Sequence, residues 1–303
     1  MMHLFLLLLL QAAAPPPLSV DEIMARVAEN QDRAKQARTE WVYQQDVLAR
    51  LHRSNGKLAR EETWKFVVTP QAKGFRKEVQ HFEGQYEHKG KMTSYDHPHY
   101  EYKGIDVDGD LISDLGEAFG AEETHNEDPH TGETHHDEAT GVHVHVDAHE
   151  GEARANLFPL TKAVQRGYTF TLEGREDYRG MDVYRVSFRP GHRGESDHDG
   201  GDADWKGEAI IDAAEFQSIV VTTGLAWGIP GAVKVLLGTD LHHVGFKITY
   251  KKVADGVWFP EVYGGEFNFK ALFLYKRTFS ISVKNSEFRK TDVSSKIAFE
   301  TPQ

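Results

Sequence analysis

Histidine is the residue type that offers the clearest chemistry in this chain. Seven of the 17 histidines fall within residues 125–149. Residues 141–147 alternate in character, so on a strand His143, His145 and Asp147 would point the same way. Two imidazoles and a carboxylate on one face suit Zn²⁺ or Ni²⁺. The candidate metal ligands are therefore His135, His136, His143, His145, Asp147 and His149.

The same segment has two other interpretations: weak metal binding without a defined site, and a solvated low-complexity insert. Residues 104–153 contain 15 acidic residues and no Lys or Arg, whereas the whole chain has 47 acidic and 35 basic residues. Without that segment, 32 acidic residues face 35 basic ones, so the acidity of the chain is local. Because few side chains there are apolar, we predict that residues 122–150 form a disordered insert.

No constellation typical of a catalytic centre accompanies the histidines. The chain has no Cys, which excludes thiolate nucleophiles, disulfides and Cys-based zinc sites. The nucleophile motif Gly-x-Ser-x-Gly and the zinc motif His-Glu-x-x-His are both absent. No pair of carboxylates stands in apolar surroundings that would raise a pKa. We therefore expect no enzyme, and the lack of a basic stripe argues against a nucleic-acid partner.

Residues 1–14 have the pattern of a cleavable export signal. An apolar run from Leu4 to Leu10 is followed by the small residues Ala12 to Ala14 and then by Pro15. The run is too short for a membrane-spanning helix, which needs about 20 apolar residues. We expect cleavage after Ala14 and a mature chain that is periplasmic and soluble, with no transmembrane segment.

A helix followed by many strands is expected after the signal. Ser19 and Glu22 have the spacing of a capping box, and apolar residues recur at helical spacing as far as Ala37 or Arg38. From residue 39 the apolar period becomes two. The dipeptide Asn55-Gly56 suits the positive φ angles of a type I′ hairpin turn between the first two strands. Similar patterns predict ten or eleven strands in all, with a short helix over residues 111–119 and an extended aromatic segment over 95–103.

Hairpin-joined strands of this kind form antiparallel sheets that bury one face, and a long sheet curls or closes. We therefore predict a mainly β (α+β) fold. Its centre is a strongly curved antiparallel sheet, or incomplete β-barrel, wrapped around the N-terminal helix and a few short helices. Residues 15–303 should form a single domain.

At this point the sequence resembles a known family. The export signal, the opening helix, the long meandering hairpins and the run from Asp255 to Pro260 (Asp-Gly-Val-Trp-Phe-Pro) are similar to LolA/LolB-type proteins. The resemblance covers residues 18–297 except the histidine-rich segment. It implies an unclosed β-barrel wrapped around helices, with an apolar cavity that accepts acyl chains. The absence of Cys rules out an anchored acceptor of the LolB kind.

The resemblance also gives the aromatic residues a second interpretation. Most of the Phe, Tyr and Trp side chains alternate along the predicted strands, which is typical of a core, but the same pattern is expected of side chains that line a cavity open to an apolar ligand. The sequence leaves these alternatives open. One candidate set of inward-facing residues is Trp64, Phe66, Val68, Tyr168, Phe170, Phe246 and Ile248.

These observations lead to a non-enzymatic periplasmic carrier as the first functional hypothesis. Its partners would be an apolar ligand, such as a lipid or an acyl chain, or a lipoprotein, together with a membrane-associated partner. The alternatives are a metal-binding or buffering protein that acts through residues 125–149, and a structural envelope protein without a ligand. No cofactor is expected apart from Zn or Ni at the histidine-rich segment.

Overall fold

The opening helix forms as its capping box predicts. In the computed structural model α1 spans Val20–Arg38, and the Ser19 hydroxyl accepts the backbone N–H of Glu22 while the Glu22 carboxylate accepts the N–H of Ser19. This reciprocal pair satisfies two N–H groups that a helix start otherwise leaves free. Ile23, Met24, Val27, Ala28 and Ala34 are buried along one face of the helix.

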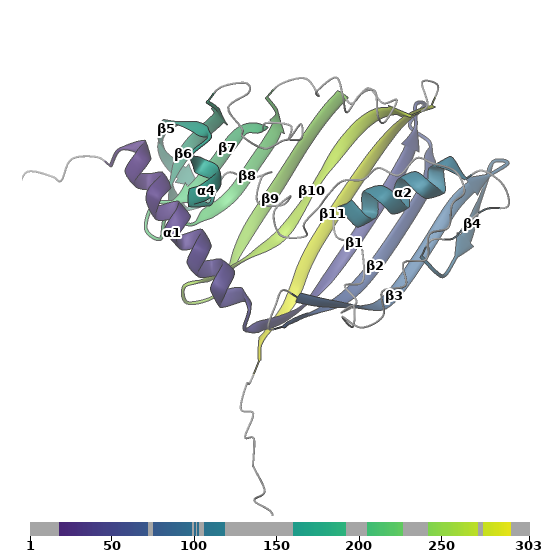
Figure 1. The fold of residues 1–303 in the computed structure, drawn as a ribbon, viewed down its shortest axis with the longest axis horizontal. Helices are drawn as coiled ribbons and strands as arrows, with labels where there is room; N and C mark the ends of the chain where they lie inside the picture. The colour runs from purple at the N-terminus through teal and green to yellow at the C-terminus, as the bar shows by residue number, and fades with distance from the viewer. Residues whose placement is uncertain are drawn as a thin grey trace, which may run out of the picture.

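The structure describes residues 18–71, 75–98, 100, 102, 106–118, 160–191, 205–226, 242–271 and 275–291. Within these residues a single antiparallel sheet contains eleven strands in the order β4-β3-β2-β1-β11-β10-β9-β8-β7-β6-β5. The sheet is open, and α1 and α2 lie on the same face of it (Figure 1). The mainly β fold predicted from the sequence, a long antiparallel sheet not closed into a barrel, is confirmed.

The element bounds show how long the central strands are. The strands are β1 (Trp41–Arg53), β2 (Leu58–Pro70), β3 (Phe75–His88), β4 (Lys91–Tyr95), β5 (Tyr168–Tyr178), β6 (Met181–Pro190), β7 (Trp205–Asp212), β8 (Ser218–Leu225), β9 (His242–Ala254), β10 (Val257–Ala271) and β11 (Tyr275–Lys290). The other helices are α2 (Val107–Ala118) and α4 (Lys162–Gln165). Helix α1 packs on β5 and β10, whereas α2 packs on β1 and β2.

The first and last strands pair with each other in the middle of the sheet. Trp41 lies opposite Lys290, and the antiparallel register continues to Arg53 opposite Arg277. A bulge interrupts it between Val42 and Gln44. Every other strand pairs with its neighbour in sequence, so this one junction joins the two halves of the meander.

The first hairpin turn differs from the sequence prediction. Gly56 has a φ of +78°, but Asn55 has no positive φ, so the turn is not type I′. Instead, Gly56 N–H donates to the Arg53 carbonyl, and Arg53 N–H donates to the Lys57 carbonyl, both at 2.8 Å. This is a type I turn closed by a left-handed glycine, the usual three-residue hairpin loop. The Asn55 side chain accepts the Lys57 N–H, which favours this arrangement.

Two other hairpins contain the pair of positive φ angles that a type I′ turn requires. Lys89 and Gly90 have φ values of +49° and +82°, and Arg179 and Gly180 have +56° and +82°. In each case a long cationic residue occupies the first left-handed position, where Asn or Asp would be less strained. A preceding acidic side chain, Glu87 or Asp177, accepts the N–H of the glycine and supports the turn.

A row of glycines lies where neighbouring backbones of β7 to β11 approach closely. A Cβ atom on Gly207 would lie 1.9 Å from the carbonyl oxygen of Thr222 in the next strand. At Gly264 the same atom would lie 2.1 Å from the Ile281 oxygen, and at Gly265 2.5 Å from the Gly245 oxygen. No side chain fits where a neighbouring backbone approaches this closely. These glycines therefore allow the strong curvature that the pattern of long hairpins predicts.

Between β3 and α2 the structure differs from one sequence prediction. The extended aromatic segment was expected over residues 95–103, but the strand there, β4, spans Lys91–Tyr95 and ends where the prediction began. The short helix was correctly predicted, although it starts four residues early, at Val107. Three predictions lie outside the described residues: the export signal over 1–14, the disordered insert over 122–150, and the metal ligands within it.

Deleting residues 122–150 is expected to leave the fold intact. The stretch offers too few apolar side chains to contribute to a core, and the eleven described strands all lie before or after it. Thermal unfolding of the deletion variant, compared with the intact chain, measures this. A melting temperature lowered by more than about 8 °C, beyond the few degrees expected per kcal/mol at this size, would show that the segment is structural.

Candidate binding face

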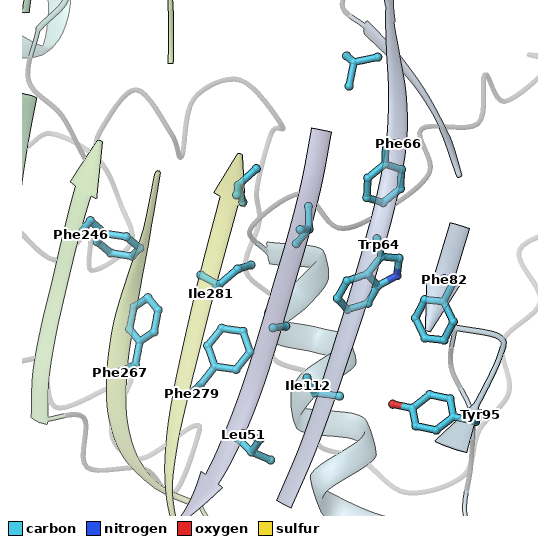
Figure 2. Packing of buried hydrophobic residues seen from close by; sticks show 14 residues of the cluster. Leu51, Trp64, Phe66, Phe82, Tyr95, Ile112, Phe246, Phe267, Phe279 and Ile281 are labelled. Atoms are coloured by element: carbon cyan, nitrogen blue, oxygen red, sulfur yellow. The ribbon is translucent and has the colours of Figure 1, made fainter. Parts of the chain in front are cut away.

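The inner face of the sheet carries a row of large apolar side chains. Figure 2 shows aromatic rings on both sides of β1, which itself contributes aliphatic side chains: Phe246 on β9, Phe267 on β10 and Phe279 on β11 lie on one side, and Trp64 on β2 and Phe82 on β3 on the other. Neighbouring rings are in contact, with centroids 4.9 Å apart for Phe246 and Phe267 and 5.4 Å apart for Trp64 and Phe82. We call this row, with the aliphatic residues between the rings, the aromatic face.

A second apolar cluster continues the same side of the sheet toward β5. It joins Ile23, Met24 and Val27 of α1 to side chains of β6 through β9. Phe246 belongs to the aromatic face and Ile248 to the second cluster. Residues two apart on a strand point to the same side, so the two clusters share one face of the sheet. We refer to both together as the inner face.

The seven predicted lining residues all lie on this face but do not form one group. Trp64, Phe66, Val68 and Phe246 are buried in the aromatic face. Ile248 is buried in the second cluster, and the half-buried rings of Tyr168 and Phe170 pack against it. The alternation of the strands therefore placed each residue correctly, and their role in binding a ligand stays a prediction.

A buried charged cluster lies at one end of the aromatic face. Arg60 is 1% exposed and Glu62 is 2% exposed. The Arg60 guanidinium donates to Tyr95 Oη at 2.7 Å, to Asp106 Oδ2 at 2.7 Å and to the Tyr100 carbonyl at 2.7 Å. Its Nε lies 3.3 Å from Glu62 Oε1, which also accepts the Tyr95 hydroxyl. One buried arginine thus pairs with two carboxylates, of which Glu62 is buried and Asp106 is partly exposed.

The pKa shifts in this cluster follow from its burial. Burial acts to lower the pKa of Arg60, but its interactions with Tyr95, Glu62 and Asp106 outweigh that effect and raise it. Burial and the Glu62 carboxylate raise the pKa of Tyr95, although Arg60 opposes the shift. Tyr95 therefore keeps its proton and donates it to Glu62 in a hydrogen bond. Arg60 keeps its charge and Tyr95 its proton near neutral pH, so the pair acts as a structural anchor and not as an acid–base pair.

The anchor holds α2 against the sheet. Asp106 caps the N-terminus of α2 by accepting the Gly109 N–H at 2.9 Å with its other oxygen. A Cβ atom on Gly109 would lie 2.4 Å from Arg60 Nη1, so glycine is needed for the guanidinium to approach. A second ion pair, between Arg277 and Asp108 at 2.7 Å, ties the same helical turn to β11. The fully buried side chain of Ile112 adds an apolar contact between α2 and the sheet.

A smaller polar group interrupts the inner face near the middle of the sheet. Gln45 Nε2 donates to Asn285 Oδ1 at 3.0 Å and to the Tyr263 hydroxyl at 3.2 Å. Asn285 in turn donates to the Pro260 carbonyl at 2.8 Å. Gln45 is 2% exposed, and its Oε1 atom has no hydrogen-bond partner among the described residues.

The described part of the chain lacks the features of two other kinds of site. Within it, no three His, Asp or Glu side chains come together as a metal site. No helix of these residues is both long enough and apolar enough to cross a bilayer.

Sequence reasoning missed the charged anchor and the polar group, although the signal was present. Arg60 and Glu62 stand at even positions, the same parity as Trp64, Phe66 and Val68, so strand alternation directs all five to one face. Gln45 likewise shares the parity of Val47, Ala49 and Leu51 on β1. These groups are found by searching for polar residues at apolar positions of an alternating strand.

Comparison with known proteins gives structural similarities only. No family model matches the chain, and no curated protein matches it. A protein of the DUF1329 family from Desulfovibrio piger is 11% identical, covering 91% of this chain and 95% of that one, with a TM-score of 0.35. A LolA superfamily protein from Nitrosomonas europaea is 9% identical, covering 87% and 94%, with a TM-score of 0.27.

A third structure, described as showing lipid–protein interactions in lipovitellin, is 9% identical over 86% of this chain and 26% of that one, with a TM-score of 0.32. All three similarities are distant, so the function of this chain has to be inferred from its own contacts. In the described residues the fold is one open antiparallel sheet with an N-terminal helix packed on its inner face.

Proposed function

We propose that this protein is a non-enzymatic carrier that holds an apolar ligand, such as a lipid or acyl chain, on the inner face of its open sheet. The observation that carries the proposal is the aromatic face, a continuous row of apolar side chains that crosses from β9 to β3. In a closed barrel or a two-sheet sandwich such a face would pack against other strands. Here all the described strands belong to one sheet.

The size of the inner face supports the proposal. Eleven strands at a spacing of about 4.8 Å make a face about 48 Å wide. The central strands contain 13 to 16 residues, so each is roughly 43 to 53 Å long. Helices α1 and α2 contain 19 and 12 residues, about 28 and 18 Å in length and about 10 Å in width. Two helices of this size cover about a quarter of the face. The remaining three quarters must be shielded from water by other chain segments or by a bound molecule.

An acyl chain has enough binding energy to serve as that molecule. Burial of hydrocarbon contributes about 0.8 kcal/mol per CH₂. Half-burial of a sixteen-carbon chain therefore contributes about 6 kcal/mol, which corresponds to a Kd on the order of 20 µM. We further propose that the protein is exported to the periplasm and takes part in lipoprotein or lipid handling at the outer membrane. These two parts of the proposal rest on the sequence.

Metal buffering by His135, His136, His143, His145, Asp147 and His149 remains a separate proposal that rests on the sequence alone. An envelope protein without a ligand is the third candidate. The experiment below separates the carrier from both, since neither predicts saturable binding of an acyl probe.

Phe170→Asp is expected to weaken binding of a fluorescent fatty-acid probe by about tenfold or more while changing thermal stability less. The ring is half-buried and contacts Tyr168 and Phe188 on the inner face. A carboxylate there would have to be desolvated by a hydrocarbon chain. Thr171→Asp is the matched control, because Thr171 is the next residue on β5, is exposed and faces the other side.

The titration has two results that contradict the proposal. The first is a folded intact protein that shows no saturable binding of the probe. The second is equal weakening by Phe170→Asp and Thr171→Asp, which would place the probe away from the inner face.

A further inference from the structure

Two hydrogen-bond donors stand without anionic partners where α1 ends against the sheet. Arg38 is the last residue of α1, and its Nη1 donates to the Trp258 carbonyl at 3.1 Å. Its guanidinium carbon lies 6.0 Å from the centre of the Phe259 ring. Within the described chain Arg38 forms no ion pair, so one of its five N–H donors is used. The Tyr250 hydroxyl, close enough to interact with Arg38, also forms no hydrogen bond with described residues.

The nearby carboxylates form ion pairs with lysines and not with Arg38. Glu40 pairs with Lys290 at 3.0 Å, and Glu215 pairs with Lys252 at 2.6 Å. Lys252 also reaches Asp255 at 3.2 Å. Arg38 therefore has no carboxylate in direct contact with it among the described residues, because each nearby carboxylate pairs with a lysine.

A purely structural role explains only part of this geometry. A cation in the last helical turn favours the negative end of the helix dipole, but the exposed Lys35 already provides one in the same turn. Arg38 is instead drawn inward, where burial lowers its pKa, while Tyr250 and Tyr43 raise it. Burial raises the pKa of Tyr250 to about 12, although Arg38 opposes the shift, so the hydroxyl remains a donor at neutral pH.

Strand β9 links these donors to the apolar surface. Tyr250 packs against the second cluster, and Ile248 and Phe246 follow on the same face. Alternate residues lie about 6.7 Å apart along a strand, so Tyr250 to Phe246 spans about 13 Å. A chain whose polar end meets Arg38 would thus continue directly over hydrocarbon side chains.

We propose that Arg38 and Tyr250 bind the oxyanion headgroup, a carboxylate or a phosphate monoester, of a single-chain amphiphile whose hydrocarbon tail follows β9 across the inner face. This proposal rests on the carrier function and specifies its ligand class. Guanidinium binds both oxyanions through paired N–H donors, and the tyrosine hydroxyl supplies a third.

Three probes with the same twelve-carbon tail test the proposal: laurate, dodecyl phosphate and dodecanol, measured by displacement of a fluorescent fatty acid from the full chain. The intact protein is expected to bind the two anions about tenfold or more tighter than the alcohol. Arg38→Gln should remove most of that preference and leave dodecanol binding unchanged. Arg38→Lys should retain part of it, and Tyr250→Phe should reduce it severalfold. Inorganic phosphate at the same concentration should not displace laurate.

Lys35→Gln is the matched control, since it removes an exposed charge from the same helical turn. Thermal unfolding confirms that each variant is folded, and Tyr250→Phe, which removes a single oxygen atom, gives the comparison if Arg38→Gln does not fold. Equal binding of all three probes, or equal effects of Arg38→Gln and Lys35→Gln, would overturn the headgroup site and leave the carrier function standing. Displacement of laurate by inorganic phosphate would show a site for the free anion and overturn the amphiphile. Failure of every probe to bind would refute both proposals.

Discussion

Arg60→Leu is expected to lower the free energy of unfolding by about 3 to 5 kcal/mol, the usual effect of removing one partner from a buried ion pair. The loss would leave Glu62 and Asp106 buried without their cation, and Tyr95 and the Tyr100 carbonyl without a donor. Denaturant unfolding measures the change. Because Arg60 also holds the first turn of α2, limited proteolysis should cut within residues 107–118 sooner in the variant than in the intact protein.

Arg50→Leu is the matched control for this experiment. Arg50 lies on the neighbouring strand and pairs with Glu61 at 2.5 Å, but its side chain is 44% exposed. Exposed ion pairs contribute about 0 to 1 kcal/mol, so this variant should unfold almost like the intact protein. Similar losses from Arg60→Leu and Arg50→Leu would show that the buried cluster does not anchor the helix.

Gly264→Ala is expected to destabilise the sheet by about 3 kcal/mol or more, which is at or above the usual range for overpacking. The added methyl group would lie 2.1 Å from the Ile281 carbonyl oxygen and 3.0 Å from the Ser282 Cα atom. Both are backbone atoms of β11, which is paired on its other side with β1. Neither can move without disturbing the centre of the sheet.

Gly174→Ala provides the comparison for the glycine substitution. Gly174 is also a strand glycine, on β5, but nothing lies within 4 Å of where its Cβ would stand and its φ is not positive. Alanine there should be neutral or slightly stabilising, because it restricts the unfolded chain. If urea unfolding gives the two variants the same stability, the close approach of β11 does not require glycine at position 264.

Local patterns predicted the elements of this fold well. The capping box at Ser19 fixed the start of α1, and strand alternation placed Trp64, Phe170 and Ile248 on the inner face. The type of the first turn was wrong because Asn-Gly fits two loop geometries, and the hydrogen bond from Lys57 N–H to the Asn55 side chain favours the longer one.

Features that depend on distant parts of the chain could not be predicted from the sequence. The ion pairs of Arg60 with Asp106 and of Arg277 with Asp108 depend on how α2 lies over the sheet. The same is true of Arg38, whose neighbours Tyr250 and Trp258 are more than 200 positions away in the sequence. A charged residue at an apolar position indicates that a partner exists but does not identify it.

The central pairing of β1 with β11 sets an order of events during synthesis. A chain that emerges from its N-terminus first presents β1 to β4, with one hydrogen-bonding edge of β1 open until the partner residues 275–290 have been made. Strands β5 to β10 can form their own hairpins in the meantime. An unpaired edge of thirteen residues attracts other strands, so the interval favours factors that hold the nascent chain unfolded. A stop codon before residue 275 would remove the seam between the two halves, whereas the two edge strands, β4 and β5, lie in the interior of the sequence and are not reached by a short truncation.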